Sequence, residues 1–349
     1  MFSKLKVQEI KQETKDTVSI AFEIPEDLKA EYAYQSGQYI TIKATVNDED
    51  VRRAYSLCSS PSENEFRIGV KKVENGKMST FLNENLSVGD KIEVMKPSGN
   101  FVINDLTSNI VAFAAGSGIT PVLSMIKSTL KQGGTFTLFY GNKTSNDTIF
   151  KKELDSLSNE YSDNFKLHYI YSRENGENKI YEGRITKEKC NGLVKENLEL
   201  LKSDGFYMCG PEEMIHGVSD SLKELGVNEN KIHFELFTTP SQKEEAVNKV
   251  DSGFSGESQV TVIMDGDEFE FGLKSDGDFI LDAAMSEGAD VPFSCKGAVC
   301  CTCKAQVIEG KAIMELNYSL SDAEVEEGFI LTCQSHPASE KLVVDYDVT

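Results

Sequence analysis

Short stretches of alternating apolar and polar positions fill the first hundred residues of the chain. Glycine, proline and asparagine separate these stretches, so that each one is bounded by turn-forming residues. Alternation of this kind between turns is typical of antiparallel strands that bury one face. The stretches with this pattern are residues 36–46, 53–60, 66–73 and 90–99. We therefore predict an antiparallel β-barrel domain over residues 1–103.

The pattern changes after this region. Residues 109–130 have the pattern of an apolar strand, a glycine turn and an amphipathic helix. Strands then alternate with helical stretches, the first of which is 150–161. The further expected strands are residues 136–141, 166–172 and 205–210. Strands and helices that alternate at this spacing favour a parallel, doubly wound sheet, and we predict such an α/β domain over residues 104–237.

A polar segment from Thr238 to Ser258 follows, and it contains almost no large apolar side chain. This composition predicts a linker over residues 238–258. The elements expected after it are a β-hairpin over 259–273 with the turn Asp265-Gly266-Asp267, a helix over 279–289 and a strand over 341–348. We predict that residues 259–349 form a third domain, of α+β type.

The charge of the chain restricts the classes of partner that it can bind. The net charge is −21, and this argues against nucleic acid and anionic membranes, which would repel the protein. From Gln259 to Thr349 there are 18 acidic and five basic residues, so this segment carries −13 of the total. Such a surface serves solubility, or it docks a basic partner, and the sequence leaves both interpretations open.

Other bulk features bear on location. No apolar run reaches the length of about 18 residues that a membrane-spanning helix needs. The first 17 residues lack the apolar core of a secretory signal. We expect a cytoplasmic protein.

Four of the eight cysteines lie within nine positions. The spacing is Cys295-x4-Cys300-x2-Cys303, and Cys333 follows after 29 residues. Crowded cysteines in a cytoplasmic chain indicate a metal site more than a set of disulfides. An iron–sulfur cluster needs soft thiolate ligands on a tight loop whose backbone N–H groups turn toward the sulfurs. This spacing therefore predicts that Cys295, Cys300, Cys303 and Cys333 hold a two-iron cluster.

Two alternatives compete with this interpretation. A zinc site would require paired C-x2-C knuckles or histidines, and His336 is the one histidine near the loop. Cys301 competes for the ligand role, but Cys300 alone preserves both spacings, so we expect Cys301 to fill space in the loop. Cys58 and Cys190 are interpreted as small buried hydrophobic residues.

Residues 114–121 form a glycine turn between an apolar strand and a helix. Gly116 and Gly118 would let phosphate oxygens approach the backbone, and the helix N-terminus supplies partial positive charge. The turn is shorter than the G-x-G-x-x-G dinucleotide fingerprint. The ends of the later strands support a ligand site at this turn, because open α/β sheets bind ligands at the carboxyl ends of their strands. These ends are Tyr140-Gly141-Asn142, Ser172-Arg173 and Cys209-Gly210-Pro211.

Arg173 suits a 2′-phosphate group, and Ser172 offers a hydrogen bond to it, so NADPH is expected in preference to NADH. The alternative is that both residues belong to a surface turn. Cys209 is interpreted as a contact that positions the nicotinamide, since no histidine lies near it in sequence to activate it as a nucleophile.

The barrel region carries candidate flavin contacts. Arg53 suits a diphosphate, Tyr55 a planar ring and Ser56 a ring nitrogen. Residues 76–80 are expected to open a helix whose N–H groups and hydroxyls receive a phosphate. Taken alone, Ser79 is explained equally well as a helix N-cap.

Taken together, these motifs resemble the ferredoxin–NADP⁺ reductase superfamily fused to a plant-type [2Fe-2S] ferredoxin. The matching motifs are Gly37-Gln38-Tyr39, Arg53-Ala54-Tyr55-Ser56, Gly69-Val70-Lys71, Pro97-x-Gly99-x-Phe101, the turn from Gly116 to Pro121 and Cys209-Gly210-Pro211. The resemblance covers almost the whole length. Within the superfamily, residues 292–320 and 328–337 are similar to the reductase subunits of phenylacetyl-CoA epoxidases.

The resemblance implies FAD in the barrel, NADP(H) on the second domain, a [2Fe-2S] cluster in a β-grasp-like ferredoxin domain, and electron delivery to a di-iron oxygenase. It implies that Arg53 and Ser79 hold the diphosphate and that Phe237 lies near one flavin face. The implied cofactor contacts are Arg53, Tyr55, Ser56, Val70, Lys71, Gly76, Lys77, Met78 and Ser79 for the flavin, and Gly116, Gly118, Thr120, Ser172, Arg173, Cys209, Gly210 and Pro211 for the nucleotide. The implied catalytic residues are Tyr55, Ser56, Thr120, Cys209 and Phe237. Ala298 and Cys301 depart from the usual loop, which has a second glycine and a small uncharged residue there.

The predicted function is an NAD(P)H-dependent reductase that passes electrons from NADPH through FAD and the cluster to oxygenase subunits, those of phenylacetyl-CoA epoxidase first among them. The alternatives are a reductase for another hydroxylase or a nitrogen-redox partner, an FMN-type oxygenase reductase, and a non-enzymatic electron carrier or sensor.

Overall fold

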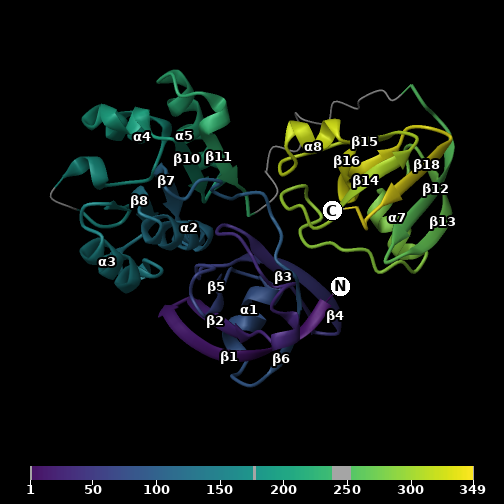
Figure 1. Ribbon diagram of the computed structural model, residues 1–349, viewed down its shortest axis with the longest axis horizontal. Coiled ribbons are helices and arrows are strands. Elements are labelled where there is room, and N and C mark those ends of the chain that lie inside the picture. Colours follow the sequence, from purple (N-terminus) through teal and green to yellow (C-terminus); the bar gives the residue numbers. More distant parts are fainter. Residues whose placement is uncertain (1, 176–177, 238–252, 349) are drawn as a thin grey trace. The chain divides into compact units, whose positions relative to one another are not determined.

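The computed structural model describes residues 2–175, 178–237 and 253–348. The chain divides into two compact units, Phe2–Phe237 and a C-terminal unit that begins after it (Figure 1). Most of the expected linker, residues 238–252, lies outside the described residues. The linker stays a prediction, and the first strand of the C-terminal unit begins at Glu257, two residues before the expected start of the hairpin. Within the described residues, no helix is long and apolar enough to cross a membrane.

The N-terminal part of the first unit is an antiparallel barrel. Its strands are β1 (Phe2–Thr14), β2 (Thr17–Glu23), β3 (Tyr39–Val46), β4 (Glu49–Ser56), β5 (Phe66–Lys71) and β6 (Lys91–Met95), with α1 (Lys77–Glu84) and the 3-10 turn η1 (Glu26–Leu28). The strand order is β4-β3-β6-β1-β2-β5, and a bridge between Leu57 and Ile68 joins its two edges. The predicted barrel is therefore confirmed.

Strand β1 was not among the individually predicted strands. It has 13 residues, of which Leu5, Val7 and Thr14 are buried. Because only these three of its side chains are buried, the apolar signal is weak, although β1 pairs with both β2 and β6. Tertiary pairing, and not local hydrophobicity, defines this strand.

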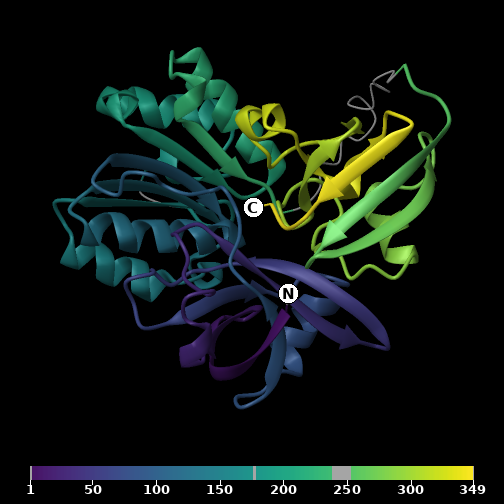
Figure 2. The ribbon, with the colours of Figure 1, turned by 45° about the vertical axis from the view of Figure 1, so that its right-hand side comes forward.

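The second part of the first unit is the predicted doubly wound domain. Its strands are β7 (Asn109–Ala115), β8 (Thr135–Asn142), β9 (Phe165–Tyr171), β10 (Gly205–Cys209) and β11 (Ile232–Glu235), and its helices are α2 (Ile119–Lys131), α3 (Lys151–Glu160), α4 (Lys187–Glu196) and α5 (Glu212–Glu224). Its 3-10 turns are η2 (Gly116–Gly118), η3 (Ser145–Asp147), η4 (Lys179–Tyr181), η5 (Leu198–Lys202) and η6 (Glu229–Lys231). Figures 1 and 2 show α2 and α3 on one face of the sheet and α4 and α5 on the other.

The sheet order β11-β10-β7-β8-β9, with parallel pairing throughout, positions the candidate nucleotide site. The chain winds outward from β7 to β9 and then returns to β10 on the other side of β7. The order therefore reverses at β7 and β10. Ligands bind outside the carboxyl ends of the strands at such a switch point.

The C-terminal unit is a small α+β domain. Its elements are β12 (Glu257–Met264), β13 (Asp267–Lys274), α7 (Ile280–Ser286), β14 (Lys304–Glu309), β15 (Ala312–Met314), α8 (Asp322–Glu326), β16 (Phe329–Leu331), the 3-10 turn η7 (Thr332–Gln334), β17 (Ser335–Pro337) and β18 (Lys341–Asp345). The main sheet has the order β13-β12-β18-β14-β16, in which β12 and β18 are parallel. The hairpin turn is one residue shorter than expected. Asp265 and Gly266 have φ of 51° and 80°, the geometry of a two-residue turn, and Asp267 already belongs to β13.

Candidate redox site

The four predicted cluster ligands come together in two pairs. The Sγ atoms of Cys295 and Cys300 are 3.1 Å apart, and Cys303 hydrogen-bonds Cys333, which lies on η7. Two thiols per pair is the ligand set of a two-iron cluster, since each iron takes two protein sulfurs. Within the described residues, no three His, Cys, Asp or Glu side chains are grouped so as to hold a single metal ion. The donor set thus fits a [2Fe-2S] group, and the individual ligand roles stay a prediction.

Hydrogen bonds favour a thiolate in each pair. The S–H of Cys300 donates to Cys295 and, outweighing burial, lowers the pKa of Cys295 to about 7. Cys303 lowers the pKa of Cys333 in the same way. Backbone N–H groups add to this: Gly297 donates to the Cys295 sulfur at 3.3 Å, and Ala298 donates to Cys333. Amides that converge on sulfur are what an anionic cluster requires.

The loop backbone explains one departure from the family pattern. Ala298 has φ of 63° and Lys296 has φ of 50°, both in the left-handed region that glycine occupies without cost. An L-residue there loses about 1–2 kcal/mol. Ala298 is fully buried, and its small side chain is accommodated. The departure at Ala298 therefore places a strained residue in the loop.

Cys301, the remaining cysteine of the loop, bonds a carbonyl group. Its thiol donates to the carbonyl of Ser319 at 3.3 Å, and burial raises its pKa to about 12. A thiol held as a neutral donor to a carbonyl supports the interpretation of Cys301 as packing. Cys58 and Cys190 are also buried free thiols, as expected.

The candidate flavin residues on β4 alternate in exposure. Arg53 is exposed, Tyr55 is half-buried, and Ser56 is buried at the end of the strand. Burial raises the pKa of Tyr55, so its ring presents a neutral face. Val70 and Lys71 end the neighbouring strand β5. An exposed guanidinium beside an aromatic ring is suited to a flavin diphosphate and its ring system.

Helix α1 begins at Lys77, so residues 76–80 open a helix as expected. The N-cap is Gly76, and the alternative that Ser79 is the N-cap is wrong. The Ser79 hydroxyl instead donates to the carbonyl of Gly76 and accepts from the N–H of Val73. A Cβ on Gly76 would lie 2.4 Å from the Ser79 Oγ, so glycine is required for this close approach. Met78 is buried and Lys77 pairs with Glu49.

The glycine turn at the switch point has room for a ligand. Gly116 has φ of 56°, and apart from the adjoining backbone no atom lies within 4 Å of where its Cβ would be. Gly118 shows the opposite: an added Cβ would lie 2.0 Å from the carbonyl oxygen of Cys209. One glycine therefore leaves open space ahead of α2, and the other lets α2 pack on the end of β10. Such an open, left-handed turn at a helix N-terminus fits a nucleotide phosphate.

The two halves of the site are in contact. A Cβ on Gly69 of β5 would lie 2.7 Å from the Thr120 methyl group of α2. The Ser56 hydroxyl donates to the Glu235 carboxylate at 3.4 Å. Sequence reasoning did not place Glu235 in the site, because 179 positions separate it from Ser56 and no local pattern marks it. The structure thus brings the flavin strands and the nucleotide turn together.

Cys209 is fully buried at the end of β10. Burial, reinforced by the Glu235 carboxylate, raises the pKa of its thiol well above the ordinary value. A thiol that stays protonated is a poor nucleophile, which supports its interpretation as a nicotinamide contact. Phe237, two residues after Glu235, is 42% exposed. Gly210 and Pro211 lead directly into α5.

The predicted coenzyme-selective residues lie on the rim beyond β9. Ser172 and Arg173 are exposed, and their N–H groups bond Asn142 and Lys143 at the end of β8. Sequence reasoning missed a second exposed arginine nearby. A bridge between Tyr171 and Glu182 brings Arg184 to the same end of β9.

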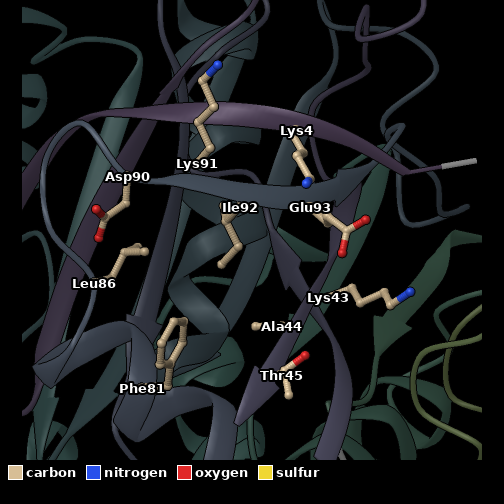
Figure 3. A pocket seen from close by; sticks show the side chains of 10 residues that line it. All are labelled: Lys4, Lys43, Ala44, Thr45, Phe81, Leu86, Asp90, Lys91, Ile92 and Glu93. Carbon is tan, nitrogen blue, oxygen red and sulfur yellow. The ribbon is translucent and has the colours of Figure 1, made fainter.

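A hollow of about 370 Å³ lies on the barrel and is separate from the predicted cofactor contacts (Figure 3). Its lining comes from β1, β3, β6, α1 and the turn before β6, and it has an apolar base with charged side chains around it. The lining includes none of the predicted flavin or nucleotide contacts.

Three family models match the chain in series. They are the oxidoreductase FAD-binding domain over residues 4–103, the oxidoreductase NAD-binding domain over 113–220, and the 2Fe-2S iron-sulfur cluster binding domain over 262–338. The order of the three domains agrees with the sequence prediction, and each covers one of the candidate sites. The predicted classes of cofactor, FAD, NAD(P) and a [2Fe-2S] cluster, are thus confirmed.

Similar proteins match this chain over almost its whole length and over almost the whole of their own. The chain is 38% identical over 352 residues to a subunit of the 1,2-phenylacetyl-CoA epoxidase of Escherichia coli (strain K12), covering 99% of this chain and 98% of that protein. It is 31% identical to the 3-ketosteroid-9-alpha-monooxygenase ferredoxin reductase component of Rhodococcus rhodochrous, covering 98% and 96%. The solved phthalate dioxygenase reductase matches with a TM-score of 0.61 at 24% identity, over 99% of this chain and 98% of that one, and supports the fold.

The glycine turn, the flavin strands and the paired thiols thus lie in the three domains that these relatives share, and in the same order. The chain belongs to the family of ferredoxin-reductase-type oxidoreductases that join FAD-binding, NAD-binding and 2Fe-2S domains in one polypeptide and serve as the electron-transfer components of oxygenases.

Proposed function

We propose that this chain is the NADPH-dependent reductase of a di-iron oxygenase, and that the oxygenase is a phenylacetyl-CoA epoxidase. The observation that carries the proposal is the contact between the flavin strands and the nucleotide turn, Gly69 against Thr120, in a unit followed by paired cluster thiols. A bound flavin accepts two electrons together as hydride and releases them singly, as the cluster requires. The residues around it have to bind, orient and shield the reacting groups.

Position in the fold supports the following proposed residue roles. Arg53 and the opening of α1 near Ser79 bind the diphosphate, and Tyr55 packs on the ring system. Ser56, tied to Glu235, hydrogen-bonds the flavin ring. Thr120 and Cys209 confine the nicotinamide, the first through its place on α2 and the second as a neutral buried thiol. Phe237 would lie near the other flavin face.

The coenzyme preference rests on Arg173, with Ser172 beside it. Replacing Arg173 by Ala removes the guanidinium that would pair the 2′-phosphate, so KM for NADPH is expected to rise about tenfold while KM for NADH stays unchanged. Lys166→Ala, at the opposite end of the same strand, is the matched control. Equal effects of Arg173→Ala on the two coenzymes would show that Arg173 belongs to an ordinary surface turn.

The choice of oxygenase is supported by the 38% identity to the bacterial epoxidase component over nearly the whole chain. The second candidate function is a reductase for another oxygenase. It is supported by the 31% identity to the reductase component of a ketosteroid monooxygenase. The test mixes the purified holoenzyme and NADPH with epoxidase oxygenase subunits and phenylacetyl-CoA, and in parallel with a ketosteroid oxygenase and its steroid. Epoxide formed only in the first mixture supports the proposal, and product only in the second overturns it.

We also propose a cytoplasmic location. All eight cysteines are free thiols, and a chain with this many unpaired cysteines is suited to a reducing compartment. Fractionation of the native host checks this.

A further inference from the structure

A polar face of helix α2 joins the nucleotide domain to the barrel. Its residues recur at spacings that place them on one side of the helix. They are Thr120, Ser124, Lys127, Ser128 and Lys131. Opposite them runs the segment 57–65 between β4 and β5, which is rich in serine. We call this contact the α2 seam.

Two serines on successive turns of the helix make hydrogen bonds across the α2 seam. Ser124 donates to the carbonyl of Ser59 at 2.5 Å. Ser128 bonds both Ser36 and Ser60 through their hydroxyls, the second at 3.0 Å. These serines are buried, so the bonds are shielded from water. Hydroxyl contacts fix direction as well as distance, which apolar packing does not.

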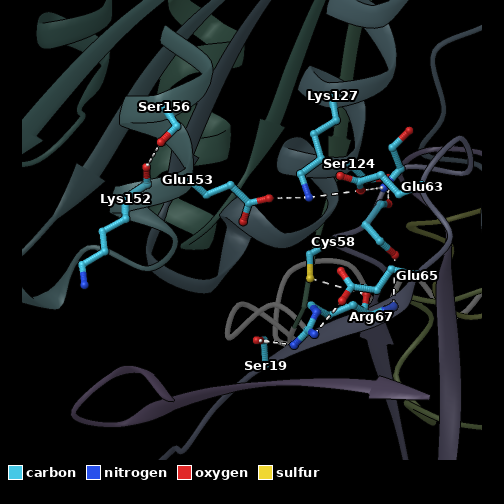
Figure 4. Close-up of polar contacts among 12 residues, drawn as sticks. Ser19, Cys58, Glu63, Glu65, Arg67, Ser124, Lys127, Lys152, Glu153 and Ser156 are labelled. Carbon is cyan, nitrogen blue, oxygen red and sulfur yellow. Dashed lines mark hydrogen bonds and ion pairs between the residues drawn. The ribbon is translucent and has the colours of Figure 1, made fainter. Parts of the chain in front are cut away.

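Lys127 is the charged member of the seam. Its side chain is only 10% exposed and lies between two carboxylates, Glu63 of the barrel at 3.2 Å and Glu153 of α3 at 2.5 Å (Figure 4). Burial by itself lowers the pKa of Lys127, but the two carboxylates outweigh it and the net shift is upward, so the ammonium stays charged. Glu63 is held in turn by the N–H of Ser60 at 2.6 Å. The ammonium therefore ties two elements of the nucleotide domain to the barrel.

The same helix begins at the nucleotide turn. Thr120 lies seven residues before Lys127, about 10 Å along a rigid helix. Its methyl group touches β5 at Gly69, just before the predicted flavin contacts Val70 and Lys71. A tilt of α2 at Lys127 would therefore move Thr120 and the turn at Gly116–Gly118 relative to the flavin strands.

We propose that Lys127 is a positioning residue for the reaction between nucleotide and flavin. It touches neither reactant. Its ion pairs with Glu63 and Glu153 set how α2, and with it the nucleotide turn, is placed on the barrel. Loss of the ammonium leaves two carboxylates facing each other across the α2 seam, and their repulsion opens it. A displacement of about 1 Å at the reacting atoms lowers a rate by about 100-fold.

The central variant is Lys127→Met, which keeps the length of the side chain and removes its charge. In rapid mixing with NADPH, the holoenzyme variant is expected to reduce its flavin at least about tenfold more slowly at saturating coenzyme. Its FAD content and its reduction by dithionite are expected to stay unchanged. Hydrogen exchange, measured with and without cofactors, is expected to rise in peptides 57–65 and 119–131 and not in β1, β2 or β9.

The matched control is Lys131→Met on the next turn of α2. Lys131 is exposed and donates to the carbonyl of Ser62 at 3.4 Å without an ion pair to the barrel among the described residues. We expect its flavin reduction rate to remain within about twofold of the unaltered protein, because exposed contacts contribute little. Lys127→Arg keeps the charge, and its flavin is expected to be reduced at close to the rate of the unaltered protein.

A second variant keeps the test decisive if Lys127→Met does not fold. Glu63→Gln removes only the barrel partner and is expected to slow flavin reduction in the same direction by a smaller factor. The proposal is overturned if the folded Met variant, or otherwise Glu63→Gln, reduces flavin within twofold of the unaltered protein with unchanged exchange in the seam peptides. These measurements use coenzyme and bound flavin alone, so they are independent of which oxygenase the chain serves.

Discussion

The thiol loop and the flavin–nucleotide site are built in opposite ways. Three of the four candidate cluster ligands lie within nine positions, and the fourth comes from one later turn. The flavin–nucleotide site draws on β4, β5, α1, the turn before α2 and the ends of β10 and β11. The first site is held by the local backbone, and the second by the contact between two domains.

This difference decides where each site is vulnerable. In the thiol loop, Lys296 and Ala298 adopt the left-handed backbone conformation, and N–H groups of the loop point toward sulfur. This geometry costs local backbone strain. In the other site, the close approach of Gly118 to Cys209 and the α2 seam set the geometry. Substitutions at ligands should abolish function in the first, and substitutions far from any cofactor should impair the second.

The largest effect is expected for Cys300→Ser. Loss of one thiolate from the first pair should lower cytochrome c reduction at least about 100-fold and leave ferricyanide reduction by the flavin within about twofold. Cys301→Ser is the control, because the Cys301 thiol donates to the carbonyl of Ser319 and Cys301 is not among the predicted ligands. Iron and acid-labile sulfide measured on both proteins check the assignment. Loss of iron from Cys301→Ser with retention in Cys300→Ser would reverse it.

A second prediction concerns Gly118→Ala. The added Cβ would lie 2.0 Å from the Cys209 carbonyl oxygen, so α2 must move away from β10. We expect flavin reduction by NADPH to slow by about 100-fold while cluster content is unchanged. Gly192→Ala in α4 is the matched control, since its Cβ meets only the Ile180 side chain at 3.5 Å. Equal rates in the two variants would show that this close approach does not set the geometry.

A smaller effect is expected for Ala298→Gly in the thiol loop. Glycine relieves the left-handed strain but gains freedom in the unfolded chain, and the net gain in unfolding free energy should be about 1 kcal/mol. The urea midpoint of the cluster absorbance measures this. Ala283→Gly, in the ordinary helical backbone of α7, should lower the same midpoint. A lower midpoint for Ala298→Gly as well would mean that the loop tolerates alanine without strain.

The smallest effect concerns pH in the first unit. His168 lies between the rings of Phe139 and Tyr181, at 4.9 and 5.4 Å, and burial lowers its pKa. The unfolded chain then binds more protons below its ordinary pKa of about 6.5, so stability is complete above that pH and falls as the pH drops below it. His168→Phe should reduce this slope in urea unfolding between pH 7.5 and 5.5. Burial also lowers the pKa of His233, so this histidine should account for the pH dependence of stability that remains in the variant. An unchanged slope would place the proton uptake elsewhere.

Parts of the fold followed from local pattern and parts did not. The glycine turn, the strand ends at Asn142, Tyr171 and Cys209, and the hairpin of the C-terminal unit lie where the pattern indicated, within one or two residues. Strand β1 was overlooked because few of its side chains are buried. The N-cap of α1 is Gly76 and not Ser79, a choice that the hydroxyl's bonds to the preceding turn decide.

By itself, the sequence determined the three-domain order and the spacing of the cluster thiols, because cysteine spacing and strand–turn–helix patterns are local and carry their chemistry with them. The family resemblance of its motifs implied the cofactor classes. Only the tertiary structure decided that the thiols pair two and two, that Ser56 meets Glu235, and that a largely buried Lys127 lies between Glu63 and Glu153. These contacts join positions that are far apart along the chain. Such partners are selected by packing and by the burial of charge, and neither leaves a periodic mark in the sequence.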